Sequence, residues 1–342
     1  MVIWAGADGE GLFSSTLFVF SFSTRDWSAL AFSASSVSPC PRHFHSYVLY
    51  GERLYIFGGK SNGYLSDLWV FDFCSRAWQE LDGHHSKSPN KPIARFGHSA
   101  VCYGEQMIVF GGYDQHGFCC EDITTWNFSA APGETSWGRI KTEHPGAIPG
   151  GLERYHHSAV VSDHSMYIFG GRNSVQTCEP DLVEFHIPTR QVNIVKTVGT
   201  APGPRWGHSA AVSGGKMYVF GGCDGAVAFS DLYSYSFVAR TWELIKVSTC
   251  PSLRYFSTLC ALGDELGSLC VMGGKDSSNH CMSDIHIFRP VTAGGSLEAG
   301  KIVVSIPSYE LSSSVPSSPS SPPPNPAVSP PFGPPFSSSS SS

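Results

Sequence analysis

The strongest constraint on the fold is a block that occurs five times: an Arg, a His-Ser or related pair three residues later, and an apolar run that ends in two glycines. One copy reads RFGHSAVCYGEQMIVFGG from Arg95 to Gly112. The first glycine follows the Arg by 16 residues in four copies and by 19 in the last, and the first glycines recur at spacings of 53, 59, 51 and 52 residues. The chain is therefore an array of similar units. The arginines are Arg42, Arg95, Arg154, Arg205 and Arg254; the glycine pairs are Gly58-Gly59, Gly111-Gly112, Gly170-Gly171, Gly221-Gly222 and Gly273-Gly274.

Each unit predicts four short antiparallel strands. The first follows the Arg, and the second is the apolar run, whose continuous hydrophobicity indicates burial on both faces. The third strand begins with an Asp, and the fourth carries a large ring in three units and Val192 in a fourth unit. The third strands are expected at 66–73, 121–128, 180–187, 230–237 and 283–290, with Asp67, Asp122, Asp181, Asp231 and Asp284 near their starts.

A four-stranded sheet with two apolar faces must stack on copies of itself, and a ring of such sheets protects most strand edges. We therefore predict an all-β propeller. A sixth unit at the N-terminus has a third strand and Trp27 but no Arg-His-Ser strand. This gives six blades of four strands, with an incomplete first blade. Either that blade lacks its innermost strand or the chain is an N-terminally shortened form; residues 301–306, KIVVSI, could close the ring or serve as the last fourth strand.

The Arg, His-Ser, Gly-Gly, Asp-Leu-aromatic and late Trp positions, in this order over residues 1–290, resemble the kelch repeat family. The strand sequences are most similar to those of the leucine-zipper-like regulator group. The resemblance implies a protein-interaction scaffold without enzymatic activity. It also implies two alternatives: a substrate-recognition subunit of a cullin-type ubiquitin ligase, although we find no BTB-type domain here, and a metal-dependent oxidase or lyase built on the same ring.

The start of the first strand and the end of the second strand are expected at one end of the propeller. The residues that follow the arginines and the glycine pairs would then form a basic, aromatic surface, which is typical of interaction sites. The expected ligand is an acidic peptide or a chain-terminal carboxylate, which the repeat arginines would bind through bidentate hydrogen bonds. The candidate binding residues are Lys60, Phe96, Tyr113, Tyr155, Arg172, Trp206, Tyr255 and Lys275.

The repeated arginines have a competing structural interpretation. One Arg and one Asp per unit, at the same end, predict fixed internal ion pairs, so the repeat Arg, Asp and Gly positions are expected to be structural. Lys60, Arg172 and Lys275 have no repeated acidic partner and are the better candidates for ligand contact.

His45, His98, His157 and His208 also recur once per unit. A ring of histidines suggests a metal, but equivalent positions next to a small Ser favour hydrogen-bonded framework residues. The sequence contains no GxSxG, P-loop or HExxH motif. We therefore expect no catalytic residue, no metal and no cofactor.

A net charge of −6 favours neither nucleic acid nor an anionic membrane as a partner. Eleven cysteines, mostly in predicted strands, indicate buried thiols and a cytoplasmic location. We expect a propeller domain at 1–310 and a disordered Ser/Pro-rich tail at 311–342, because such a composition cannot bury a core. Its proline-rich segments could bind SH3 or WW modules.

Overall fold

The computed structural model describes residues 1–4, 6, 15–32, 37–85, 87–130, 136–143, 151–247, 250–264, 267–290 and 297–302, with backbone only for 290 and 297–302. The expected Ser/Pro-rich tail, and the boundary expected at residue 310, lie outside these residues. No described segment is a helix with the length and hydropathy needed to cross a membrane.

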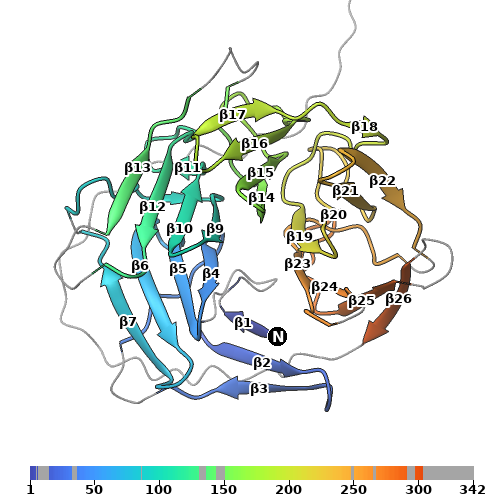
Figure 1. The fold of residues 1–342 in the computed structure, drawn as a ribbon. Coiled ribbons are helices and arrows are strands. Elements are labelled where there is room, and N and C mark those ends of the chain that lie inside the picture. Colours follow the sequence, from blue (N-terminus) through green and yellow to red (C-terminus); the bar gives the residue numbers. More distant parts are fainter. Residues whose placement is uncertain are drawn as a thin grey trace, which may run out of the picture. The chain divides into compact units, whose positions relative to one another are not determined.

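The described strands form a six-bladed β-propeller, which confirms the predicted fold class (Figure 1). Blade 1 contains β1 (Val2–Trp4), β2 (Leu17–Ser21) and β3 (Asp26–Leu30). Blade 2 contains β4 (Ser46–Tyr50), β5 (Arg53–Lys60), β6 (Tyr64–Asp72) and β7 (Ala77–Asp82). Blade 3 contains β9 (Ser99–Tyr103), β10 (Gln106–Phe110), β12 (Ile123–Asn127) and β13 (Trp137–Ile140).

Blade 4 contains β14 (Ser158–Ser162), β15 (Ser165–Phe169), β16 (Leu182–His186) and β17 (Gln191–Ile194). Blade 5 contains β19 (Ser209–Ser213), β20 (Lys216–Phe220), β21 (Leu232–Ser236) and β22 (Thr241–Ile245), and β18 (Val198–Gly199) pairs parallel with β22. Blade 6 contains β23 (Thr258–Ala261), β24 (Leu269–Met272), β25 (Ile285–Pro290) and β26 (Leu297–Ile302). The first two residues of KIVVSI, Lys301 and Ile302, belong to β26, the fourth strand of blade 6. For these residues the structure supports the second of the two roles considered above.

Six apolar clusters fill the spaces between neighbouring blades and close the ring. The rings of the fourth strands enter these spaces: Trp137 lies 5.1 Å from Phe57 of blade 2, and Trp242 lies 5.3 Å from Phe169 of blade 4. Val192 occupies the equivalent place in the cluster that contains Phe110. Each blade therefore shields an apolar face of the preceding blade, as a stack of two-faced sheets requires.

The glycine pairs end the second strands where the next blade comes closest. A Cβ built on Gly111 would lie 2.7 Å from the carbonyl oxygen of Arg154 and 2.9 Å from the His157 ring, and its φ is +68°. Only glycine accepts both the close approach and this left-handed conformation without strain. The pairs therefore fix the spacing of the blades at the end of the propeller where the arginines lie.

Candidate functional site

In each complete blade, the residue after the repeat Arg pairs through its backbone with the residue after the glycine pair. In blade 3 the pairing forms a short two-stranded sheet between β8 (Arg95–Phe96) and β11 (Tyr113–Asp114). We call this end of the propeller the mouth. The pairs are His43 with Lys60, Phe96 with Tyr113, Tyr155 with Arg172, Trp206 with Cys223, and Tyr255 with Lys275.

The aromatic members of these pairs, together with Tyr64, form an array of two groups around the mouth. Tyr64 lies 5.4 Å from Phe96, and Tyr113 lies 5.2 Å from Tyr155. On the other side, Trp206 lies 5.5 Å from Tyr255. Of these six rings, all except Tyr155 are partly exposed. The structure therefore brings together the aromatic residues that the sequence placed at one end of the ring.

A plug of three rings, Phe44, His156 and Phe256, connects the two sides of this array. Their centroids lie 4.6 to 4.7 Å apart, and His156 also lies 4.9 Å from Tyr155. These residues occupy the second position after the repeat Arg, where blades 3 and 5 have Gly97 and Gly207. The analysis of the sequence missed this position, because Phe, Gly and His alternate there and show no single residue type.

Three cations surround the plug. The Arg172 guanidinium lies 4.6 Å from the centre of the Trp206 ring, and the Lys60 amine lies 5.7 Å from the rings of Tyr64 and Phe96. Within the described part of the chain, neither these two nor Lys275 forms an ion pair with a carboxylate. The Nε of Arg172 is buried and has no hydrogen-bond partner there.

Two histidines beside these cations have lowered pKa values, mainly because they are buried. Burial, followed by the charges of Lys60 and Lys275, lowers the pKa of His43 to about 4. Burial, followed by Arg172 and His43, lowers the pKa of His156 to about 3. Both imidazoles are therefore neutral at pH 7, and the positive charge of the mouth comes from the two lysines and Arg172.

Acidic side chains also lie beside the mouth, but each accepts hydrogen bonds from backbone N–H groups of its own loop. Asp114 Oδ1 accepts hydrogen bonds from the N–H groups of His116 and Phe118, at 2.8 and 3.0 Å. Asp276 makes the same turn in blade 6, and Asn173 makes it in blade 4. Asp224 in blade 5 makes a tighter turn and accepts from the N–H groups of Ala226 and Val227. The analysis of the sequence did not identify these side-chain turns, although four units have an Asp or Asn two residues after the glycine pair.

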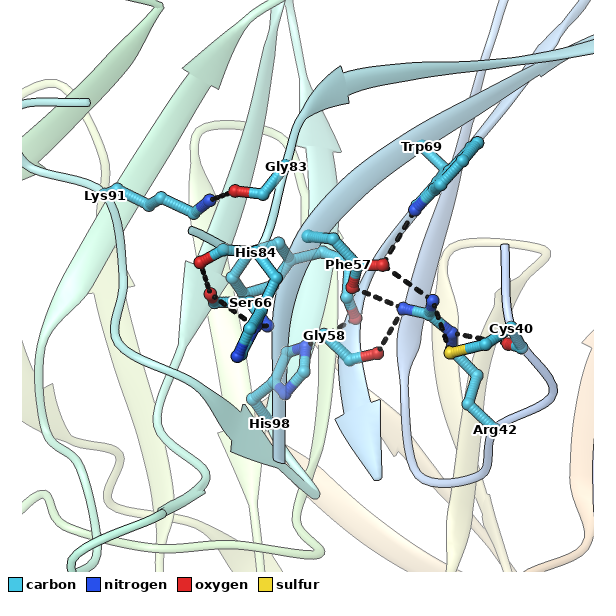
Figure 2. Close-up of polar contacts among 11 residues, drawn as sticks. Cys40, Arg42, Phe57, Gly58, Ser66, Trp69, Gly83, His84, Lys91 and His98 are labelled. Carbon is cyan, nitrogen blue, oxygen red and sulfur yellow. Dashed lines mark hydrogen bonds and ion pairs between the residues drawn. The ribbon is translucent and has the colours of Figure 1, made fainter. Parts of the chain in front are cut away.

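The repeat arginines lie under the mouth and hold the blades internally. Arg42 donates from Nη1 and Nη2 to the two carboxylate oxygens of Asp67, at 2.6 and 2.7 Å, and to the Gly58 carbonyl at 3.1 Å (Figure 2). Burial opposes ionisation of Asp67, but the hydrogen bonds and charge of Arg42 outweigh it and lower the Asp67 pKa. The same bidentate pairs join Arg95 with Asp122, Arg205 with Asp231, and Arg254 with Asp284.

Blade 4 departs from this arrangement. Arg154 is only 1% exposed, yet it forms no ion pair with Asp181 and donates to the carbonyls of Leu152, Gly170 and Gly151 at 3.1 to 3.5 Å. Burial lowers its pKa, and Glu179, more than Asp181, opposes this shift. Glu179 is itself buried and accepts a 2.7 Å hydrogen bond from Asn173. Arg154 is therefore attracted at longer range by Glu179 and Asp181, instead of forming a direct ion pair with Asp181.

The repeated histidines point between blades and do not converge. His157 Nε2 lies 2.8 Å from Ser99 Oγ of the preceding blade, and His208 makes the equivalent contact with Ser158. His98 Nε2 lies 3.2 Å from the Phe57 carbonyl, and His45 packs edge-on against Trp4. Among the described residues, no three His, Cys, Asp or Glu side chains are grouped to hold a metal ion.

The loop between blades 2 and 3 adds a second feature at this end of the ring. Asp82 accepts hydrogen bonds from Trp137 and Ser88 and lies 3.4 Å from Lys91, whose amine also donates to the Gly83 carbonyl (Figure 2). His84 contacts Ser66 beside a cavity of about 440 Å³. Since Lys91 already has partners, this loop offers a weaker anion site than the mouth.

Comparison with known proteins supports the fold and identifies the family. Residues 1–150 and 97–294 match the family model described as the KLHDC2/KLHL20/DRC7 Kelch-repeats domain. The chain is 27% identical to the leucine-zipper-like transcriptional regulator 1 homolog of Drosophila melanogaster over 86% of its own length and 29% of that protein. It is 28% identical to human host cell factor 2 (65% and 29%) and 32% identical to bovine kelch domain-containing protein 3 (53% and 48%).

The chain thus spans less than half the length of each of these relatives. Among solved structures, it superimposes on YjhT with a TM-score of 0.64 at 15% identity, over 83% of this chain and 91% of that one. That likeness supports the fold, and the family match covers most of the chain. The chain therefore belongs to the kelch-repeat family.

Proposed function

We propose that this propeller is a protein-interaction module that binds an acidic segment of a partner at the mouth, without chemistry. The observation that carries the proposal is the combination of three cations without carboxylate partners among the described residues and a partly exposed aromatic array. Aromatic rings supply contact area at low entropic cost, and the cations supply charge selectivity.

The five repeat arginines are not the residues that bind the partner's carboxylates in this proposal. Four of them already hold an Asp in a bidentate pair, and all five are at most 1% exposed. Lys60, Arg172 and Lys275 are therefore the residues that would contact an acidic side chain or a terminal carboxylate. Arg172 is the most specific of the three, because Trp206 holds its guanidinium plane in place.

The test compares the full chain with the triple variant Lys60→Glu, Arg172→Glu, Lys275→Glu. Both proteins are used to select from a random peptide display library, and bound peptides are sequenced. The wild type should enrich Asp, Glu or acidic C-termini, and the variant should lose this enrichment while its melting temperature changes little. Lys216→Glu is the control, because Lys216 is exposed at the far end of blade 5. Enrichment without acidic preference, or retained in the triple variant, would refute the proposal.

The two alternatives make different predictions. An oxidase or lyase requires a resident metal, so stoichiometric iron or copper in purified protein would favour it over the binding module. A recognition subunit of a cullin-type ligase should retain a cullin complex when the full chain is used as bait. This ligase alternative is compatible with the kelch family match and with a protein-interaction scaffold. In that case the mouth would bind a segment of the ligase substrate.

A further inference from the structure

Three of the loops that follow the glycine pairs present a large apolar side chain to solvent. Phe118 of blade 3 is 65% exposed, Val175 of blade 4 is 76% exposed, and Val227 of blade 5 is 53% exposed. Single exposed apolar side chains are common on protein surfaces, but these three lie at the same end of three consecutive blades, between the second and third strands. We call these three residues the apolar arc.

The backbone of each residue of the apolar arc is fixed by a side chain of its own loop. Asp114 accepts a 3.0 Å hydrogen bond from the Phe118 N–H, and its own N–H donates to the Phe118 carbonyl at 2.9 Å. Asp224 accepts from the Val227 N–H at 2.9 Å, and Asn173 fixes the third member in the same way at 3.1 Å. Loops fixed in this way lose little conformational entropy on binding, so the arc is preorganised for contact.

The three loops adjoin one another and the Arg172 side chain. Cys119 Sγ of the blade 3 loop lies 3.9 Å from the Arg172 carbonyl, and Cys178 Sγ of the blade 4 loop donates to the Asp224 carbonyl at 3.5 Å. The guanidinium of Arg172 turns toward the blade 5 loop, since its Nη2 lies 3.3 Å from the place that a Cβ on Gly225 would occupy. The cation of blade 4 therefore lies beside the loops that carry the apolar arc.

The corresponding loops of blades 2 and 6 are polar. They begin with Lys60 and Lys275, and these two blades flank blade 1 in the ring. In blade 6, Asp276 accepts from the His280 N–H at 2.9 Å, so a polar ring stands where the same turn in blade 3 presents Phe118. The exposed residues of the two loops include Asn62, Gly63, Ser277, Ser278, Asn279 and His280. The mouth therefore has a basic, polar side at blades 2 and 6 and an apolar side at blades 3 to 5.

We propose that the apolar arc makes the mouth specific for a partner segment in which bulky apolar side chains accompany an acidic residue. This inference rests on the proposed function, because Arg172 is the group that holds the acidic residue beside the arc. The apolar side chains of the segment cover the arc, and further acidic residues lie toward Lys60 and Lys275. Burial of apolar surface supplies affinity, and the placement of the charges supplies orientation.

Charge favours a partner over the undescribed stretches of the same chain. The longest of these, residues 303–342, has a single acidic residue, Glu310. The stretch 7–14 has two acidic residues, but Gly6 and Ser15, the described residues on either side of it, follow β1 and precede β2 in blade 1. In a ring of six blades, blade 1 is opposite blade 4, the central blade of the apolar arc.

The test applies the random peptide display library to the full chain and to the arc variant Phe118→Ser, Val175→Ser, Val227→Ser. The wild type should enrich peptides that combine Asp or Glu with Leu, Ile, Phe or Trp. The arc variant should keep the acidic preference and lose the apolar preference. Acidic peptides without apolar preference, or an apolar preference that persists in the arc variant, would overturn this inference and leave the proposed function intact. No acidic preference in the wild type would overturn both.

A single enriched peptide measures the size of the effect. Its Kd for each full chain is determined by fluorescence anisotropy, and the arc variant should bind it at least about tenfold more weakly. The control is Val198→Ser, Val238→Ser, Leu244→Ser, because these side chains are at least half exposed on β18, on β22 and in the turn before β22. It removes as many exposed apolar side chains and should leave the Kd unchanged. Equal weakening by the two variants would overturn the assignment of the site.

The free full chain distinguishes the possible occupants of the apolar arc. Hydroxyl radicals should oxidise Phe118 in the free chain at every protein concentration, and the enriched peptide should protect it. Protection in the free chain that does not depend on concentration would mean that a segment of the same chain covers the arc. Protection that grows with concentration would mean that a second copy covers it. Either result would overturn the assignment to a partner segment.

Discussion

Trp137 of blade 3 donates its indole N–H to Asp82 of blade 2, at 2.6 Å and across 55 residues of sequence. Asp82 is 6% exposed, and the buried Lys91 lies 3.4 Å from it. The carboxylate therefore joins two blades and the loop between them. Such an interaction is costly to break from one side, because the remaining charge stays buried.

Replacing Asp82 by Ala should lower the free energy of unfolding by about 3 kcal/mol, since it leaves the Lys91 amine without its carboxylate. Glu243→Ala is the control, because the Lys216–Glu243 pair is exposed and should contribute less than about 1 kcal/mol. Urea denaturation measures both. Similar losses for the two variants would contradict a special role of Asp82.

The repeated arginines give a comparison between equivalent positions. Arg95 and Arg154 are both 1% exposed, but only Arg95 forms a bidentate ion pair. Arg95→Met should cost about 3 kcal/mol, because Asp122 loses its bidentate partner and keeps only Arg139, at 3.4 Å. Arg154→Met should cost less, since no carboxylate is left unpaired by direct contact. Equal costs in urea denaturation would show that the missing pair in blade 4 has no energetic consequence.

The sequence predicts the roles of residues that repeat from blade to blade. It does not predict the roles of positions whose residue type changes between blades. The pairing of Arg with Asp, the glycine spacing and the shared mouth all follow from one position per blade. The plug of Phe44, His156 and Phe256 does not, because its residue type changes from blade to blade. The separation of Arg154 from Asp181 depends on how Glu179 is buried, and spacing alone does not reveal which carboxylate turns inward.

Acid should destabilise the propeller in a defined range. Burial lowers the pKa of His45, His98 and His208 from 6.5 to about 3. Below pH 6.5 the unfolded chain therefore binds protons that the folded chain does not, so stability falls as the pH decreases toward 3. Each such histidine contributes up to about 1.4 kcal/mol per pH unit.

The measurement is the free energy of unfolding between pH 7.5 and 4.5, from urea titrations. The wild type should lose stability steadily below about pH 6.5, and His208→Gln should show a smaller slope. His116→Gln, at an exposed loop position, should keep the wild-type slope. A flat profile in this range, or equal slopes for both variants, would be inconsistent with neutral buried imidazoles.

The glycine pairs should differ in their tolerance of a methyl group, according to whether a neighbouring blade fills the space. Gly111→Ala would put Cβ 2.7 Å from the Arg154 carbonyl, so we expect a loss of more than about 3 kcal/mol. Gly104→Ala has a similar positive φ, with nothing within 4 Å, and should cost about 1 kcal/mol. Gly273→Ala should resemble Gly104→Ala, although it occupies the same repeat position as Gly111, because the nearest described atom to its Cβ is the Met282 carbonyl oxygen, at 3.7 Å. A cost for Gly273→Ala as large as that of Gly111→Ala would mean that the space beside blade 6 is already filled.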